Sequence, residues 1–249
     1  MARNQKAHRA GYWWLLATAG GWIVGTAIAV VLAAIAKMWR VLQNAEYIYA
    51  FRAGVVFGSA GLVVGMVVGL GQWLVLRGRI RGAGWWILGT TVALGLGNAA
   101  GEIVFSWIAN SLGPWKFVPF ARAMWCWISG GAMCGLILGV AQWLVLRRRA
   151  RSAGWWIPAN ILSWAAGAIS GQYAGCAVLN LLGRGHSAGW AIVRVPWYDL
   201  PVPSIYYMVL NVGYWPGHLV VAVLVGVITG LVLARLLSRP IHDGANVSS

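Results

Sequence analysis

Two stretches of the chain share one pattern: GQWLVLRGRIRGAGWW at residues 71–86 and AQWLVLRRRARSAGWW at residues 141–156. In each stretch an apolar run ends in QWLVLR, a short basic turn follows, and AGWW opens the next apolar run. A basic turn between two apolar runs is typical of two membrane helices joined on the cytoplasmic side. The repeated stretch therefore predicts a helical hairpin connection that occurs twice.

The composition indicates a membrane protein. The 249 residues are 60% hydrophobic and only 9% charged, which is too little polar surface to cover a water-soluble globule. The apolar runs have about the 20 residues that a helix needs to cross a hydrocarbon core, and they lack the alternation of barrel strands. We predict an all-α polytopic membrane protein with six transmembrane helices at residues 11–36, 53–76, 83–108, 124–146, 153–181 and 207–237.

Lys and Arg residues set the predicted orientation. The N-terminus, the turns at 77–81 and 147–151, and the segment 235–239 carry more of them than the opposite connections. Because cytoplasmic segments are enriched in Lys and Arg, we expect both termini on the cytoplasmic side of a bacterial inner membrane. The segment 182–206 is then an extracytoplasmic loop and 239–249 a cytoplasmic tail. The net charge of +15 is divided among these clusters, which favours anionic lipid headgroups as partners over nucleic acid.

The single membrane domain, 1–249, contains a threefold internal repeat at about 10–76, 83–146 and 153–237. The second helix of each hairpin has a small residue at every fourth position, which lets a neighbouring backbone approach closely. In this alignment the last helix has lost QWLVLR. Packing within the chain explains these residues best, and contact with another subunit is the alternative. The aligned positions are Gly61, Gly65 and Gly69, then Gly131, Gly135 and Gly139, then Ala222, Gly226 and Gly230.

The QWLVLR and AGWW residues are predicted to fix the depth of the hairpins in the membrane. Arginine stems extend along apolar surface toward lipid phosphates, and tryptophans settle at headgroup level. The glutamines are predicted to form hydrogen bonds between helices, and a specific anionic-lipid site is the alternative role of the arginines. The predicted anchors are Gln72, Trp73, Arg77, Arg79, Arg81, Trp85 and Trp86 in the first copy, and Gln142, Trp143, Arg147, Arg148, Arg149, Trp155 and Trp156 in the second.

Four polar residues in the apolar runs are candidates for function, because intramembrane polar groups often mark pathways. Asn98, Glu102, Gln172 and His218 are predicted to form a cluster near the outer surface, where interhelical hydrogen bonding is the simpler explanation. Two deeper tryptophans, Trp22 and Trp164, are predicted to pack against glycine faces or against lipid, (bacterio)chlorophyll or carotenoid.

Catalytic and metal motifs do not emerge from the sequence. His186, Asp199 and Ser204 have the residue types of a hydrolytic triad, but no nucleophile elbow accompanies them. The three cysteines, Cys126, Cys134 and Cys176, lie in apolar runs at spacings that fit no metal motif. We therefore predict no catalytic residue, no metal site and no required cofactor.

QWLVLR, the basic turn and AGWW, followed by a helix with W-x-x-G, resemble an uncharacterised Trp-rich repeat of membrane proteins from cyanobacteria and filamentous phototrophic bacteria. The resemblance covers residues 10–36 and 53–181 and implies a helical membrane fold in phototrophic hosts, but no activity. The sequence predicts a non-enzymatic subunit that packs against other membrane protein subunits, in a photosynthetic or respiratory complex. The alternative is a small channel or transporter with the four polar residues at its outer mouth.

Overall fold

The computed structural model describes residues 2–35, 49–80, 82–111, 120–147, 152–181 and 214–238. Within these ranges the regular structure is helical, as the sequence predicts, and the segments 182–206 and 239–249 lie outside them. A short 3₁₀ helix, η2 (Ala153–Trp155), leads directly into α6. The long helices are α1 (Ala2–Ile35), α3 (Tyr49–Leu76), α4 (Gly84–Ser111), α5 (Phe120–Leu146), α6 (Trp156–Leu181) and α9 (Tyr214–Ser238).

Five of these helices are long and apolar enough to cross a membrane, which supports a multi-pass membrane protein. Helix α6 is not among them, because polar residues such as Asn160, Ser163 and Gln172 lower its hydropathy. Helix α9 begins at Tyr214, so Pro216 lies in its first turn, where a missing N–H breaks no helical hydrogen bond. The apolar segments are Arg9–Leu32, Gly54–Leu76, Gly84–Ala109, Met124–Leu146 and Pro216–Leu237.

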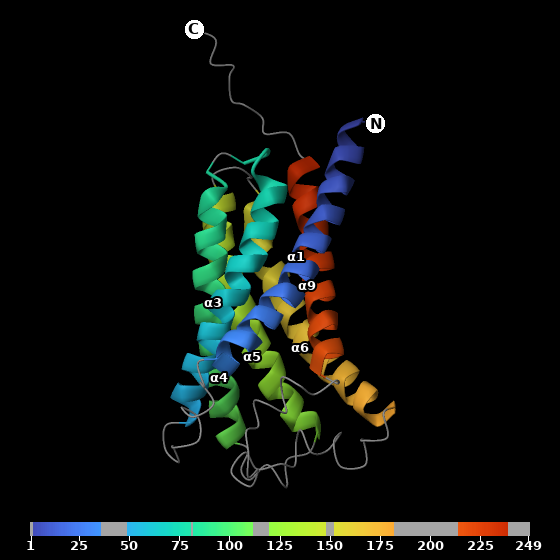
Figure 1. The fold of residues 1–249 in the computed structure, drawn as a ribbon. Helices are drawn as coiled ribbons and strands as arrows, with labels where there is room; N and C mark the ends of the chain where they lie inside the picture. The colour runs from blue at the N-terminus through green and yellow to red at the C-terminus, as the bar shows by residue number, and fades with distance from the viewer. Residues whose placement is uncertain are drawn as a thin grey trace.

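The long helices form a closed ring. Each has its main contacts with two neighbours: α1 with α3, α3 with α4, α4 with α5, α5 with α6, and α6 with α9. The ring closes because α9 also packs on α1. Figure 1 shows the start of α1 and the end of α9 at the same end of the bundle as the α3–α4 turn, where Gly82 has a φ of 76°. We call this the terminal end and the opposite one the distal end.

Glycines on α3, α5 and α9 line three contacts between neighbouring helices. A β-carbon added to Gly65 would lie 2.8 Å from the Thr91 Cα of α4, and one added to Gly135 would lie 2.9 Å from the Ile161 Cα of α6. We call the α3–α4, α5–α6 and α9–α1 contacts the first, second and third seams. The predicted packing glycines that meet a neighbouring helix here are Gly61, Gly65, Gly69, Gly131, Gly135, Gly139, Gly226 and Gly230.

The third seam corrects the sequence alignment of the last helix by one turn. In each seam, the residue that follows a Trp-Trp pair faces one glycine of the neighbouring helix, so these three glycines occupy equivalent places. The pairs, with the distance from an added β-carbon to the facing Cα, are Gly69 with Ile87 (3.2 Å), Gly139 with Ile157 (3.1 Å) and Gly226 with Leu15 (3.4 Å).

The predicted alignment put Gly230 at this place, and it is wrong. His218 and Ala222 precede Gly226 at the intervals that the other two glycine faces show, so His218 stands where the first two seams have a glycine. TGLVLA at 229–234 then takes the place of QWLVLR. Of QWLVLR, α9 keeps LVL at 231–233 and has lost the Gln, Trp and Arg.

Candidate functional site

Three tryptophans meet at the centre of the ring near the terminal end. Trp14 of α1, Trp86 of α4 and Trp156 of α6 have no exposed surface. Their rings pack edge to face, with centroids 5.5 Å apart for Trp14 and Trp86, 5.7 Å for Trp14 and Trp156, and 5.9 Å for Trp86 and Trp156. This geometry suits the charge distribution of aromatic rings, and it fills the centre of the bundle. We call these residues the tryptophan layer.

The prediction that both tryptophans of each AGWW anchor the chain at the lipid headgroups is wrong for Trp86 and Trp156. Trp85 and Trp155, the first of each pair, are 68% and 71% exposed, whereas the second is buried. Successive residues of an α-helix differ by about 100° around the axis, so only one indole of a pair faces the centre. Each pair therefore divides between surface and core.

Two glutamines connect the tryptophan layer to the surrounding helices. The Gln72 amide donates to the Thr18 hydroxyl of α1 at 3.0 Å and accepts from the Trp86 indole of α4 at 2.9 Å. Each glutamine thus joins its own helix to two others, as membrane interiors require of buried polar groups. In the same way Gln142 donates to Thr90 at 3.1 Å and accepts from Trp156 at 2.9 Å.

The third seam lacks such a glutamine. Thr229 takes its place and accepts from the Trp14 indole at 2.9 Å, but its hydroxyl donates to the Val225 carbonyl of its own helix. Asn160 comes four residues after Trp156, at the interval that separates Thr18 and Thr90 from Trp14 and Trp86, and its amide donates to the Trp156 carbonyl at 2.9 Å. Its Oδ1 is buried without a hydrogen-bond partner. The polar network is therefore incomplete beside α9.

Thr18, Thr90 and Asn160 are not among the residues predicted from the sequence. Thr18, Thr90 and Asn160 each come four residues after the second Trp of a pair, which places them one turn further along the same helix face. That spacing, together with QWLVLR, is the signal that could have predicted a polar layer next to the tryptophan layer.

A second aromatic contact lies toward the distal end, where Trp22 and Trp164 pack with ring centroids 5.1 Å apart. The Trp22 indole donates to the Nδ1 of His218 at 3.3 Å, whereas the buried Trp164 Nε1 has no hydrogen-bond partner. Leu94 takes the equivalent place on α4 and is also buried. Both deep tryptophans therefore belong to the core.

Three of the four polar residues predicted as one cluster form hydrogen bonds, each to a different partner. Asn98 accepts from the Cys134 thiol at 3.6 Å, and Glu102 accepts from the Ser106 hydroxyl at 3.5 Å on its own helix. His218 accepts from Trp22 of α1, and Gln172 lies half-buried on α6. These contacts tie neighbouring helix turns or helix pairs rather than building one site.

At the terminal end, two exposed arginines lie over tryptophan rings. The Arg77 guanidinium carbon is 5.6 Å from the centroid of Trp73, and that of Arg147 is 5.4 Å from the centroid of Trp143. Both distances are within the range of cation–π interactions. Arg79 instead donates to the Val75 carbonyl. The remaining predicted anchors of these turns, Arg81, Arg148 and Arg149, lie outside the described residues.

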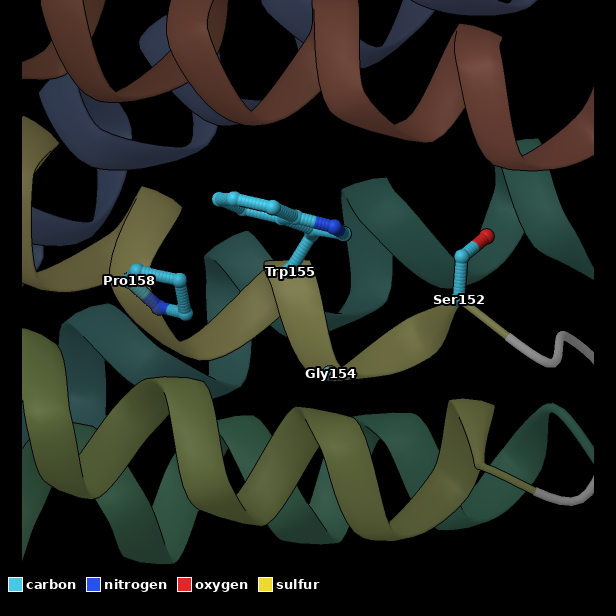
Figure 2. A pocket seen from close by; sticks show the side chains of 4 residues that line it. All are labelled: Ser152, Gly154, Trp155 and Pro158. Atoms are coloured by element: carbon cyan, nitrogen blue, oxygen red, sulfur yellow. The ribbon is translucent and has the colours of Figure 1, made fainter.

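An open depression borders η2 on the outside of the bundle, lined by Ser152, Gly154, Trp155 and Pro158. Figure 2 shows these residues along η2 and the first turn of α6, with the Trp155 indole standing clear of the helix. Its polar side-chain groups are the Ser152 hydroxyl and the Trp155 indole N–H, so these lining residues form no constellation for acid–base or nucleophilic chemistry.

Within the described ranges, no three His, Cys, Asp or Glu side chains lie close enough to hold a metal ion. Cys126 and Cys134 are buried free thiols. No protein-family model, curated protein or solved structure matches the chain. The resemblance to the Trp-rich repeat of phototrophic bacteria therefore stays a prediction.

Proposed function

We propose that this protein is a non-enzymatic membrane subunit that packs against a larger membrane complex, photosynthetic or respiratory. The filled centre of the ring supports this proposal most. Trp14, Trp86 and Trp156 have no exposed surface, and all three indole N–H groups bond to residues of the bundle. A bundle whose buried polar groups serve its own packing is what a structural subunit requires.

The proposal includes six spans arranged as three hairpins, with α6 as the sixth. Although α6 is less apolar than the other helices, two of its polar residues face inward: Asn160 and Ser163 are buried, whereas Leu162 is 66% exposed. A helix that hides its polar groups in the bundle can present an apolar face to lipid. Mean hydropathy therefore understates how well α6 suits a membrane.

The proposed location is a bacterial inner membrane with both termini in the cytoplasm. The described terminal end carries the arginines Arg9, Arg77, Arg79, Arg147 and Arg235. Short segments rich in Lys and Arg remain on the cytoplasmic side, which supports this orientation.

Exposed aromatic residues offer surfaces for neighbouring subunits, lipids or pigments. Toward the distal end, Trp107 of α4 is 72% exposed and Trp125 of α5 is 63% exposed. Tryptophan is enriched both at membrane interfaces and in the centres of protein interfaces. These two exposed tryptophans of α4 and α5 are therefore our first candidates for contact with a partner.

The test is gentle purification of the tagged protein in digitonin, followed by native electrophoresis and an absorption spectrum. We expect the protein to migrate with a larger complex, and Trp107→Ala with Trp125→Ala to release it, while the exposed Trp85→Ala serves as a matched control. A stable monomer, together with intact membrane complexes in a deletion strain, would contradict the proposal. Co-purifying absorbance in the visible range would identify pigment contact.

The alternative function is a channel or transporter with Asn98, Glu102, Gln172 and His218 at its outer mouth. The filled tryptophan layer argues against it, because a continuous path along the ring axis would have to pass three packed indoles. Solute flux into proteoliposomes that is lost in Glu102→Ala would instead favour transport.

A further inference from the structure

The two Trp–Arg pairs at the terminal end have a geometry that the packing of the bundle does not require. Arg77 and Arg147 are exposed and stand immediately beyond the ends of α3 and α5. Each guanidinium is held over the indole one turn earlier, at 5.6 Å and 5.4 Å from the ring centroids. Stacking on an indole orients the planar guanidinium while its N–H groups remain available to a second partner.

The charge around these pairs calls for an anion. Among the described residues the sole carboxylate side chain is Glu102, sixteen residues after Trp86 on α4 and therefore about 24 Å away along the helix axis. Arg79 and Arg235, both exposed, add further positive charge at the terminal end. Phosphate accepts bidentate hydrogen bonds from a guanidinium, which makes it the anion that best fits an oriented arginine.

Apolar residues continue from each pair along the outer surface of the bundle. Leu70 and Leu74 of α3 are 42% and 54% exposed on the turns before Arg77. Val140 and Leu144 hold the equivalent places on α5 and are 37% and 45% exposed. An anion with acyl chains could therefore place its phosphate at the arginine and its chains along this stripe, which a free phosphate cannot use.

The third repeat provides an internal control. In the corrected register, Gly230 and Ala234 of α9 take the places of Trp73 and Arg77. The third seam therefore lacks both the indole and the guanidinium. From these contacts, we propose that the Trp73–Arg77 and Trp143–Arg147 pairs are two binding sites for the phosphate of an anionic phospholipid. These two lipid sites do not depend on the subunit role proposed above.

The test uses the full-length protein in detergent with phosphatidylcholine, titrated with phosphatidylglycerol and followed by native mass spectrometry. We expect two tightly held phosphatidylglycerol molecules per chain. Loss of one arginine removes about 1 kcal/mol of attraction to an anionic lipid, so Arg77→Gln should weaken one site about fivefold, and Arg77→Gln with Arg147→Gln should weaken both. The exposed Arg9→Gln, at the same end of the bundle, should leave both sites unchanged.

Two controls separate an oriented site from simple charge. Arg77→Lys keeps the charge but loses the planar stack. We therefore expect its affinity for phosphatidylglycerol to lie between the affinities of wild type and Arg77→Gln. Trp73→Leu keeps both arginines and should also weaken one site, which tests the pair even if the double arginine variant folds poorly. The proposal is overturned if the double variant binds as much phosphatidylglycerol as wild type, if Lys binds as well as Arg, or if glycerol phosphate competes as well as the lipid. Migration of the double variant on native gels tests the subunit role separately.

Discussion

The first and third seams have the same helix geometry but different bonds. In the first, Gln72 of α3 joins α1 through Thr18 and α4 through Trp86. In the third, Thr229 of α9 bonds Trp14 of α1, and its own hydrogen returns to α9. One residue therefore decides whether a seam joins three helices or two.

The seams also differ toward the distal end. A β-carbon at Gly131 in the second seam would lie 2.7 Å from the Trp164 carbonyl oxygen, so the two backbones touch. His218 holds the equivalent place in the third seam and reaches α1 through its ring, which accepts from Trp22. Backbone contact over several glycines excludes a side chain, whereas a histidine requires space. At this level the third seam therefore lacks the backbone contact that glycine permits in the second.

The largest effect should come from filling a tight seam. We expect Gly131→Leu to lower the free energy of unfolding by 3 kcal/mol or more, at the upper end of about 1–3 kcal/mol for overpacking, because the backbone of α6 cannot move aside easily. Gly20→Leu is the matched control, since a β-carbon there meets nothing within 4 Å. Thermal unfolding in detergent, followed by tryptophan fluorescence, measures both. Equal losses in the two variants would show that seam packing is not the cause.

A smaller loss of stability is expected for Gln72→Leu, and a still smaller one for Thr229→Val. Leucine at 72 leaves the buried Trp86 N–H without an acceptor and removes the bond to Thr18, and each unsatisfied buried group costs about 1–3 kcal/mol. Thr229→Val removes one of two hydrogen bonds across the third seam, the one from Trp14, and leaves the bond from Trp22 to His218 in place. We therefore expect the glutamine variant to unfold at lower denaturant concentration. If Thr229→Val lowered the stability more than Gln72→Leu, the extra hydrogen bond of Gln72 would not make the first seam the stronger one.

The smallest expected effect is a gain in stability. Asn160→Thr introduces the residue that the other two repeats have, has a similar volume, and removes the unpartnered buried Oδ1. We expect the free energy of unfolding to rise by about 1 kcal/mol, a typical cost of one buried polar group without a hydrogen-bond partner. The reverse change, Thr90→Asn, should lower stability, because it disturbs the hydroxyl that accepts from Gln142. A loss in both variants would indicate that Asn160 is satisfied by a bound water.

The glycine spacing was enough to predict helices and their packing faces, but not the register of α9. Small residues at 222, 226, 230 and 234 repeat every fourth position, so the pattern looks the same after a shift of one turn. Only LVL at 231–233, which matches LVL in QWLVLR, distinguishes the two alignments. The bonds of Thr229 and the contacts of Gly226 resolve it.

Composition also could not predict which tryptophan of each Trp-Trp pair is buried. Hydropathy assigns the same value to Trp85 and Trp86, although one is 68% exposed and the other fully buried. The helical period distinguishes them, because Thr90 follows Trp86 at one turn and shares its face. The predicted cluster of four polar residues does not form, for a different reason. The sequence register sets the depth of a residue along the bundle, but it does not determine which neighbour the side chain contacts.

Closure of the ring also orders the assembly of the protein during synthesis. Trp14 and its acceptor Thr229 are 215 residues apart, so the first helix enters the membrane long before its final neighbour exists. Until α9 is translated, the indole N–H of Trp14 and the side of α1 around Gly11 face lipid or another protein. The last step of folding is then the docking of one C-terminal helix against the first, where Thr229 and His218 meet the Trp14 and Trp22 indoles.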